Sequence, residues 1–141
     1  MFKKILVGYD GSKGGRLALA KAIELAKGCG GTLTALWVQE PLPRYSDLPG
    51  EPEDQAEAGG AYYRLRAQEI ESLAREHGLE IRSDSRRGHP AKTMVAYAHE
   101  GGFDLIVLGH SDHSELWGRL LGDIAGRVCD HAHCSVLVVK E

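Results

Sequence analysis

Short runs of apolar and β-branched residues alternate along the chain with longer stretches in which apolar residues recur every three or four positions. The short runs are typical of buried strands, and the longer stretches are typical of helices with one buried face. The predicted strands cover residues 3–9, 32–38, 80–84, 104–108 and 135–139, and the pattern is weakest over 80–84. The predicted helices are marked by Leu19, Ala22, Ile23 and Ala26; by Tyr63, Ala67, Ile70 and Ala74; by Ala91, Met94, Val95 and Ala98; and by Trp117, Leu121, Ile124 and Val128.

Regular alternation of strands and helices predicts an α/β domain with one doubly wound parallel sheet and helices on both faces. The continuous apolar character of the strands fits this class, because such strands are covered on both sides. Ligands of doubly wound sheets bind beyond the carboxyl ends of the strands, where the strand order reverses. The residues that follow Tyr9, Val38 and Leu108 are therefore the first candidates for a site.

One segment, residues 39–60, departs from this rhythm. It holds four of the five prolines and six acidic residues against a single basic residue, Arg44. Prolines interrupt regular structure and like charges repel one another, so the segment is predicted to be irregular and mobile. It leaves from the binding edge of the sheet, so it is either a solvated loop or a lid over the strand ends.

Length and charge narrow the class of protein. A chain of 141 residues fits one domain, here taken as 1–141. The net charge of −3, without a basic cluster, argues against nucleic acid as a partner. The apolar runs fall far short of the roughly 20 residues of a membrane helix, and no signal-peptide pattern opens the chain. We therefore predict a cytoplasmic protein with no membrane partner.

The cysteines and histidines raise the question of a metal. Cys29, Cys129 and Cys134 are odd in number and follow no paired framework, which predicts reduced, buried thiols. His110, His113, His131, His133 and Cys134 are residue types that bind zinc, but they form neither an HExxH nor a CxxC pattern. Surface histidines are the preferred interpretation, and a metal-binding regulator is the weaker alternative.

The turn Asp10-Gly11-Ser12 follows the first predicted strand. A carboxylate or hydroxyl at this point can cap the following helix, because the first backbone N–H groups of a helix have no partner within it. The same turn lies at the expected ligand edge, where Asp10 could also meet a ribose hydroxyl or a metal ion. Both interpretations remain open from the sequence.

Several motifs together resemble the universal stress protein family over the full length of the chain. They are the opening run from Ile5 to Ser12, the triplet Gly88-His89-Pro90, the run from Asp104 to Gly109, and the closing run from His131 to Val139. The resemblance implies a Rossmann-like, five-stranded parallel sheet in the order 3-2-1-4-5 and dimerisation through the last strand. In one branch of the family it also implies ATP held by the motif Gly-x2-Gly-x9-Gly-(Ser/Thr).

Laid on this chain, the family's phosphate motif matches at two of four positions. Gly109 and Gly122 match, whereas Asp112 replaces the second glycine and Asp123 replaces the hydroxyl residue. Glycine and hydroxyl suit these positions because backbone N–H groups must close on phosphate oxygens. A carboxylate about 4 Å from a phosphate charge costs about 4 kcal/mol at an effective dielectric constant near 20. The nucleotide site is therefore predicted to be degenerate, with no cofactor expected.

By resemblance, the residues that would meet a nucleotide come from four stretches of the chain. They are Asp10, Gly11, Ser12, Val38, Gly109, His110, Asp112, His113, Gly122, Asp123 and Ile124. Val38 enters as the residue after the second strand whose backbone would face adenine. One alternative is an ATP or AMP binder in which Asp10, Asp112 and Asp123 hold magnesium against the phosphates.

Taken together, the sequence predicts a non-enzymatic stress-response module that acts as a homodimer with unknown protein partners. No nucleophile beside a positioned base is visible, and slow ATP hydrolysis is left open. The predicted dimer edge is Val136, Leu137, Val138 and Val139, because the last strand of a 3-2-1-4-5 sheet has unpaired backbone groups.

Overall fold

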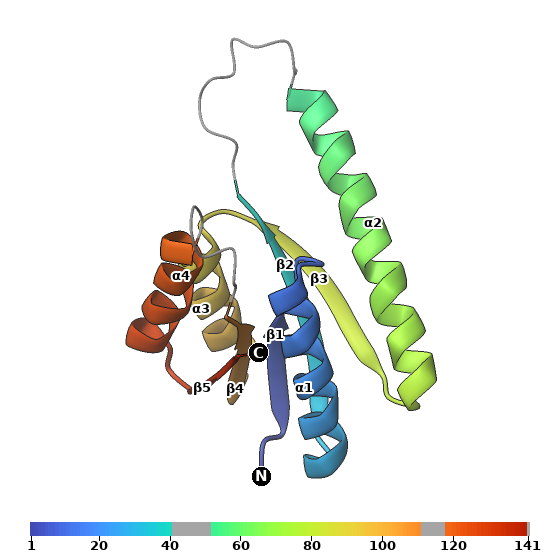
Figure 1. Cartoon of the computed structure of the whole chain (residues 1–141), viewed down its shortest axis with the longest axis vertical. Coiled ribbons are helices and arrows are strands. Elements are labelled where there is room, and N and C mark those ends of the chain that lie inside the picture. Colours follow the sequence, from blue (N-terminus) through green and yellow to red (C-terminus); the bar gives the residue numbers. More distant parts are fainter. Residues whose placement is uncertain (41–51, 111–117, 141) are drawn as a thin grey trace.

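The structure, a computed structural model, describes residues 1–40, 52–110 and 118–140, with the backbone alone for 52–58 and 118–123. Strands and helices alternate throughout this part of the chain (Figure 1). The strands are β1 (Lys4–Gly8), β2 (Thr32–Gln39), β3 (Ile81–Arg87), β4 (Leu105–Gly109) and β5 (Ser135–Val139). The helices are α1 (Lys13–Cys29), α2 (Pro52–His77), α3 (Pro90–Glu100) and α4 (Gly118–His131).

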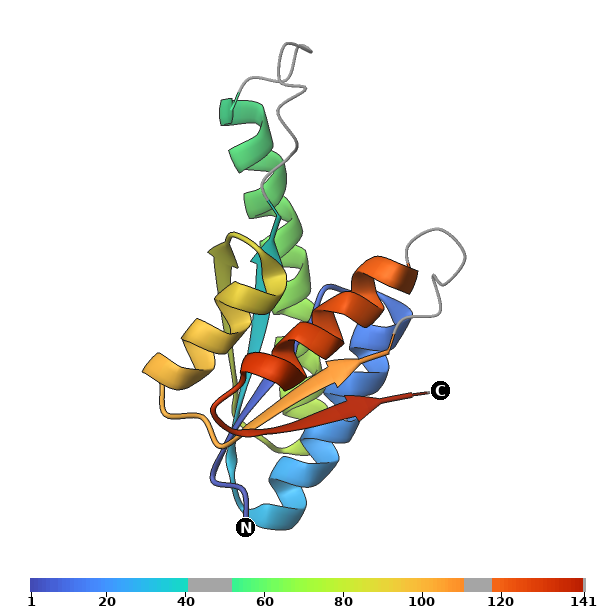
Figure 2. The same cartoon turned by 90° about the vertical axis from the view of Figure 1, so that its left-hand side faces the viewer.

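The five strands form one parallel sheet in the order β3-β2-β1-β4-β5. Helices α1 and α2 lie on one side of the sheet, and α3 and α4 lie on the other (Figures 1 and 2). The predicted fold class and strand order are therefore confirmed. The order reverses between β1 and β4, so the carboxyl ends of these two strands open the crevice where doubly wound sheets bind ligands.

Two apolar clusters, one on each face, hold the layers together. The first joins α1 and α2 to the sheet through Val7, Leu19, Ile23, Ile70 and Val107, among others. The second joins α3 and α4 to the opposite face through Leu6, Met94, Ile106 and Val128, among others. Neighbouring residues of one strand point to opposite faces, so Leu6 and Val7 serve different clusters. This explains why the central strands are apolar at every position.

The helix after β2 begins earlier than the sequence predicted. Residues 39–60 were expected to be irregular, but β2 continues through Gln39 and α2 begins at Pro52. Proline is tolerated in the first turn of a helix, because its missing N–H would have no helical partner there. Acidic residues are also favoured near the N-terminus of a helix, so the acidic sequence after Pro52 does not oppose it. The expected mobility of residues 41–51 falls outside the described part of the chain.

The thiols also differ from the prediction. Cys129 is exposed on α4, and Cys29 and Cys134 are only partly buried, so the prediction of three buried thiols is wrong. Burial raises the pKa of the Cys134 thiol.

Among the described helices, none is both long and apolar enough to cross a membrane.

Helix α2 is attached to the sheet by a narrow apolar stripe and by polar contacts. Ile70 is its buried aliphatic residue, and Leu73 packs against the same cluster while Leu65 is exposed. Near the end of β1, the Tyr9 hydroxyl donates to Glu69 Oε2 over 2.5 Å. Burial first, and then the neighbouring Glu69 carboxylate, raise the pKa of Tyr9 to about 12.

The Tyr9 contact predicts a loss of stability in alkali. Because the pKa of Tyr9 rises on folding, its contribution to stability is complete below pH 10 and falls as pH approaches 12. Urea unfolding measured from pH 9 to pH 12 should therefore show a declining free energy of unfolding. The decline should be smaller in Tyr9→Phe. An equal decline in the variant would contradict the assigned role of Tyr9.

Candidate functional site

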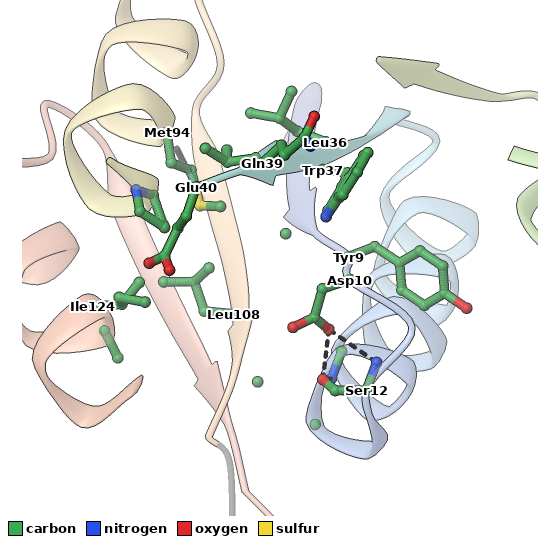
Figure 3. A pocket seen from close by; sticks show the side chains of 17 residues that line it. Tyr9, Asp10, Ser12, Leu36, Trp37, Gln39, Glu40, Met94, Leu108 and Ile124 are labelled. Carbon is green, nitrogen blue, oxygen red and sulfur yellow. Dashed lines mark hydrogen bonds between the residues drawn. The ribbon is translucent and has the colours of Figure 1, made fainter. Parts of the chain in front are cut away.

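A cavity opens at the carboxyl edge of the sheet, where the strand order reverses. Its volume is about 620 Å³, within the range of roughly 300–1,000 Å³ that is usual for small-molecule pockets. It is lined by residues from β1, β2 and β4, from the turn before α1, and from α3 and α4 (Figure 3). The sequence predicted a site at this edge.

One wall of the cavity is apolar. It is built from the ends of β2 and β4 and from the facing sides of α3 and α4, by Leu36, Val38, Met94, Leu108, Ile124 and Ala125. Four of these six belong to the second apolar cluster, and Val38 and Ile124 pack against it, so the wall continues the core. Such a wall suits a flat, weakly polar ring, because apolar side chains can pack against a ring but offer no partner to a charged group.

The opposite side carries the turn Asp10-Gly11-Ser12. Ser12 is the N-cap of α1, and its hydroxyl accepts from the Gly15 N–H over 3.1 Å. Asp10 Oδ1 accepts from the Ser12 backbone N–H over 2.9 Å and from the Ser12 hydroxyl over 2.5 Å. The predicted capping role is thus present, with Ser12 as the capping residue. Asp10 is exposed and its carboxylate faces the cavity, where it can accept from a ligand hydroxyl (Figure 3).

Gly109 closes the floor of the cavity between β4 and α1. A Cβ atom on Gly109 would lie 2.1 Å from the carbonyl oxygen of Gly14, a separation that no side chain tolerates. The glycine is therefore required by the close approach of two backbones, independently of any phosphate. This gives the first glycine of the family motif a structural reason in this chain.

The predicted site residues divide into three groups. Asp10, Ser12, Val38, Gly109 and Ile124 line the cavity. Gly11 lies in the turn behind the lining, and the His110 N–H donates to the Val139 carbonyl at the end of β5. Gly122 and Asp123 lie on the backbone of α4 directly before the lining residue Ile124, and Asp112 and His113 fall outside the described residues.

Trp37 and Glu40 are among the lining residues that were missed from the sequence. Trp37 precedes Val38 on β2, and Glu40 follows the last residue of that strand. Both lie at the carboxyl end of a strand, which is where the sequence predicts a site. They were missed because the predicted strand ended at Val38, whereas β2 continues to Gln39. The Glu40 carboxylate points toward Leu108 and Ile124, across the cavity from Asp10 (Figure 3).

The electrostatic character of the cavity follows from these residues. Asp10 and Glu40 bring two carboxylates, and no lysine or arginine is among the described lining residues. Nor do the described residues contain a group of three histidine, cysteine or acidic side chains placed to hold a metal ion. The described part of the cavity is therefore apolar and acidic.

Comparisons with known proteins agree with the fold. The model of the universal stress protein family matches residues 1–140. The universal stress protein MJ0531 of Methanocaldococcus jannaschii is 34% identical, covering 100% of this chain and 84% of that protein. The universal stress protein YxiE of Bacillus subtilis is 31% identical, covering 99% and 100% respectively.

Solved structures show the same fold. The universal stress protein UspA of Lactobacillus plantarum superposes with a TM-score of 0.82 at 24% identity, covering 98% of this chain and 97% of that chain. A universal stress protein in complex with cAMP superposes with a TM-score of 0.75 at 26% identity, over 98% of this chain and 97% of that chain. With a matching family model along nearly its whole length and relatives above 30% identity, this chain belongs to the universal stress protein family.

Proposed function

We propose that this universal stress protein is a non-enzymatic module whose cavity takes the nucleoside part of adenine nucleotides of low charge and disfavours ATP. The observation that carries the proposal is the contrast within one site. An apolar wall and the Asp10 carboxylate suit a purine ring and ribose hydroxyls, while the phosphate positions and the cavity rim are acidic.

The nucleoside half of the proposal is supported by shape and chemistry. The cavity lies at the strand-order reversal, and Ile124 and Met94 face Asp10 from the opposite side (Figure 3). A relative of 26% identity was crystallised in complex with cAMP, which carries a single phosphate charge. A structural neighbour from Arabidopsis thaliana was solved with AMP bound, at 16% identity.

The phosphate half is supported by charge. Asp112 and Asp123 replace a glycine and a hydroxyl residue of the family motif, and Glu40 adds a carboxylate at the cavity. One such carboxylate about 4 Å from a phosphate costs about 4 kcal/mol. Micromolar binding is worth about 8 kcal/mol, so two close carboxylates are enough to abolish it. Magnesium held between Asp10, Asp112 and Asp123 would reverse this balance, which is the alternative function.

The non-enzymatic part of the proposal rests on the hydroxyl in the cavity. The Ser12 hydroxyl donates to Asp10 and accepts from the Gly15 N–H, so it is engaged as a helix cap. A nucleophile needs a base that takes up its proton as the oxygen attacks the substrate, whereas the Asp10 carboxylate here also holds the turn through the Ser12 N–H.

We also propose a homodimer through β5. This strand ends the sheet order, and Val136, Leu137, Val138 and Val139 are only partly buried. Val139 accepts from the His110 N–H on the β4 side, so by alternation Val136 and Val138 direct their N–H groups away from the sheet. Antiparallel pairing of two β5 strands around a twofold axis would satisfy these groups.

The carboxylates of Asp112 and Asp123 predict a gain of ATP binding when both are removed. Native protein should bind ATP more weakly than about 100 micromolar without magnesium. Asp112→Gly with Asp123→Ser should strengthen binding at least about tenfold in calorimetry, because two nearby carboxylates are removed. The control is Glu71→Gln with Glu76→Gln, which removes the same charge from the exposed surface of α2. Low-micromolar ATP binding by the native protein, or equal gains in both variants, would contradict the proposal.

If β5 forms the dimer interface, removal of one of its outward N–H groups should give a monomer. Native protein should sediment as a dimer at tens of micromolar, and Val138→Pro should sediment as a monomer of 15.3 kDa. Arg87→Pro is the control, because Arg87 occupies an outward position on the opposite edge strand, β3. A native monomer, or a Val138→Pro variant that stays dimeric, would end the proposal for β5.

A further inference from the structure

Helix α2 reaches the cavity through an aromatic stack on Trp37. The Trp37 indole lines the cavity on one side and packs against α2 on the other. Its ring centroid lies 4.8 Å from that of Tyr62, with the planes tilted by 41°, and 6.5 Å from that of Tyr63, with the planes nearly parallel at 9°. Two tyrosines of α2 therefore fix the orientation of a cavity side chain.

The polar end of the indole faces the ligand space. In Figure 3 the Trp37 nitrogen points toward the part of the cavity above Asp10. Within the described residues, no hydrogen bond uses this N–H, although the ring itself is held in place. An oriented donor in a pocket that is otherwise apolar and acidic is a specificity element, because it favours a ligand that offers an acceptor there.

Tyr62 touches the second half of the site as well. Its hydroxyl donates to the backbone carbonyl oxygen of Asp10, the residue whose carboxylate faces the cavity. Tyr62 thus contacts both the indole on β2 and the turn after β1. Trp37 belongs to β2 and Asp10 follows β1, so Tyr62 connects two parts of the site that lie on different strands.

Arg66, one turn further along α2, supports this contact. Its guanidinium carbon lies 4.6 Å from the centroid of the Tyr62 ring, and its Nη2 lies 3.2 Å from Glu69 Oε1. Gly11 in the turn has φ of +81°, and a Cβ there would lie 1.9 Å from Arg66 Nη1. Only glycine combines this backbone conformation with the close approach of the arginine. The turn is therefore shaped to receive α2.

From these contacts we propose that Tyr62 is a positioning residue of the ligand site and that the Trp37 indole N–H donates to the bound ligand. The proposal rests on the proposed nucleoside-binding function, and it adds α2 to the site. Occupancy of the cavity and docking of α2 are then linked: the factor by which docking of the helix raises ligand affinity is also the factor by which bound ligand strengthens the docking.

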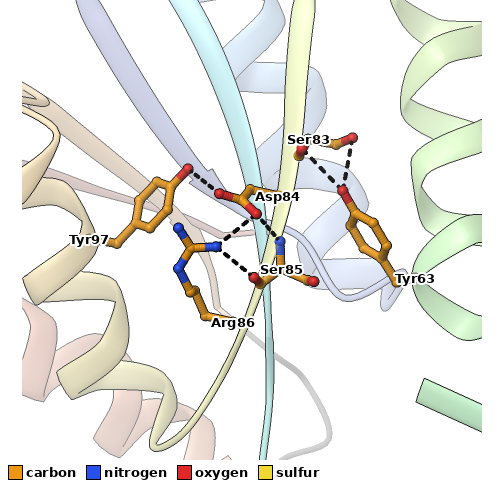
Figure 4. Close-up of polar contacts among 6 residues, drawn as sticks. All are labelled: Tyr63, Ser83, Asp84, Ser85, Arg86 and Tyr97. Atoms are coloured by element: carbon orange, nitrogen blue, oxygen red, sulfur yellow. Dashed lines mark hydrogen bonds and ion pairs between the residues drawn. The ribbon is translucent and has the colours of Figure 1, made fainter. Parts of the chain in front are cut away.

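The test of Tyr62 uses two tyrosines on the same helix. Tyr62→Phe keeps the ring on Trp37 and removes the hydrogen bond to Asp10. Tyr63→Phe is the matched control, because Tyr63 also stacks on Trp37 but its hydroxyl donates to the Ser83 carbonyl on β3 over 3.1 Å (Figure 4). Both variants lose one hydroxyl, which in Tyr62 donates to the turn after β1 and in Tyr63 donates to β3.

Two readouts separate positioning from general stability. Calorimetry with AMP should show dissociation constants raised about five- to tenfold in Tyr62→Phe and within about twofold of native in Tyr63→Phe. Hydrogen exchange of the Ser12 amide, which donates to Asp10 Oδ1, should become about tenfold faster only in Tyr62→Phe without ligand. Equal effects of the two variants on Ser12 exchange would overturn the positioning role.

Trp37→Phe tests the donor separately. The variant should bind AMP several-fold more weakly, because the phenyl ring has no N–H to donate. Hydrogen exchange of the Ser12 amide should stay as in the native protein, because the phenyl ring still packs on Tyr62. Native affinity in Trp37→Phe would overturn the donor role. If the native protein binds no AMP, the proposed function and the Trp37 donor both fail, whereas Ser12 exchange still decides the role of Tyr62.

Discussion

The reversal of strand order between β1 and β4 is the constraint on which the site depends. Helix α1 follows β1 on one face of the sheet, and α4 follows β4 on the other, so the two connections diverge and leave a crevice. The backbones approach again where Gly109 meets Gly14, and a Cβ atom there would clash with the Gly14 carbonyl. The diverging connections open the cavity, and the contact between the backbones of Gly109 and Gly14 closes its floor.

The side chains that line this crevice determine which ligand it can bind. In this chain the α3 and α4 side is apolar, and the opposite side presents Asp10 from a capped turn. In the proposed function, Asp112 and Asp123, together with Glu40, set the charge of the site against a polyanion. The fold is that of the universal stress protein family, but fold alone does not fix the ligand.

The sequence predicted the sheet well because buried parallel strands carry an unmistakable pattern. The runs at β1, β4 and β5 were located to within one or two residues, and the strand order came from the family resemblance. The start of α2 was missed because proline and acidic residues usually break structure, yet both suit the first turn of a helix.

The site itself was predictable only in part, for a related reason. Asp10 and Ser12 were found because they follow a strand, which is a local property of the sequence, whereas Val38 came from the family resemblance. The contact of Tyr62 with Asp10 joins residues 52 positions apart, and it depends on how α2 packs on β2. No local pattern encodes such a contact, because aromatic residues at helical spacing also occur in ordinary cores.

The central claim is that the cavity accepts a nucleoside and that each added phosphate charge opposes binding. The most direct test is calorimetry of native protein with adenosine, AMP, ADP and ATP at one ionic strength, without magnesium. The account predicts that affinity does not rise from adenosine to AMP and falls from AMP through ADP to ATP. An affinity that increases with each phosphate would contradict it, because the acidic residues would then not oppose the phosphates.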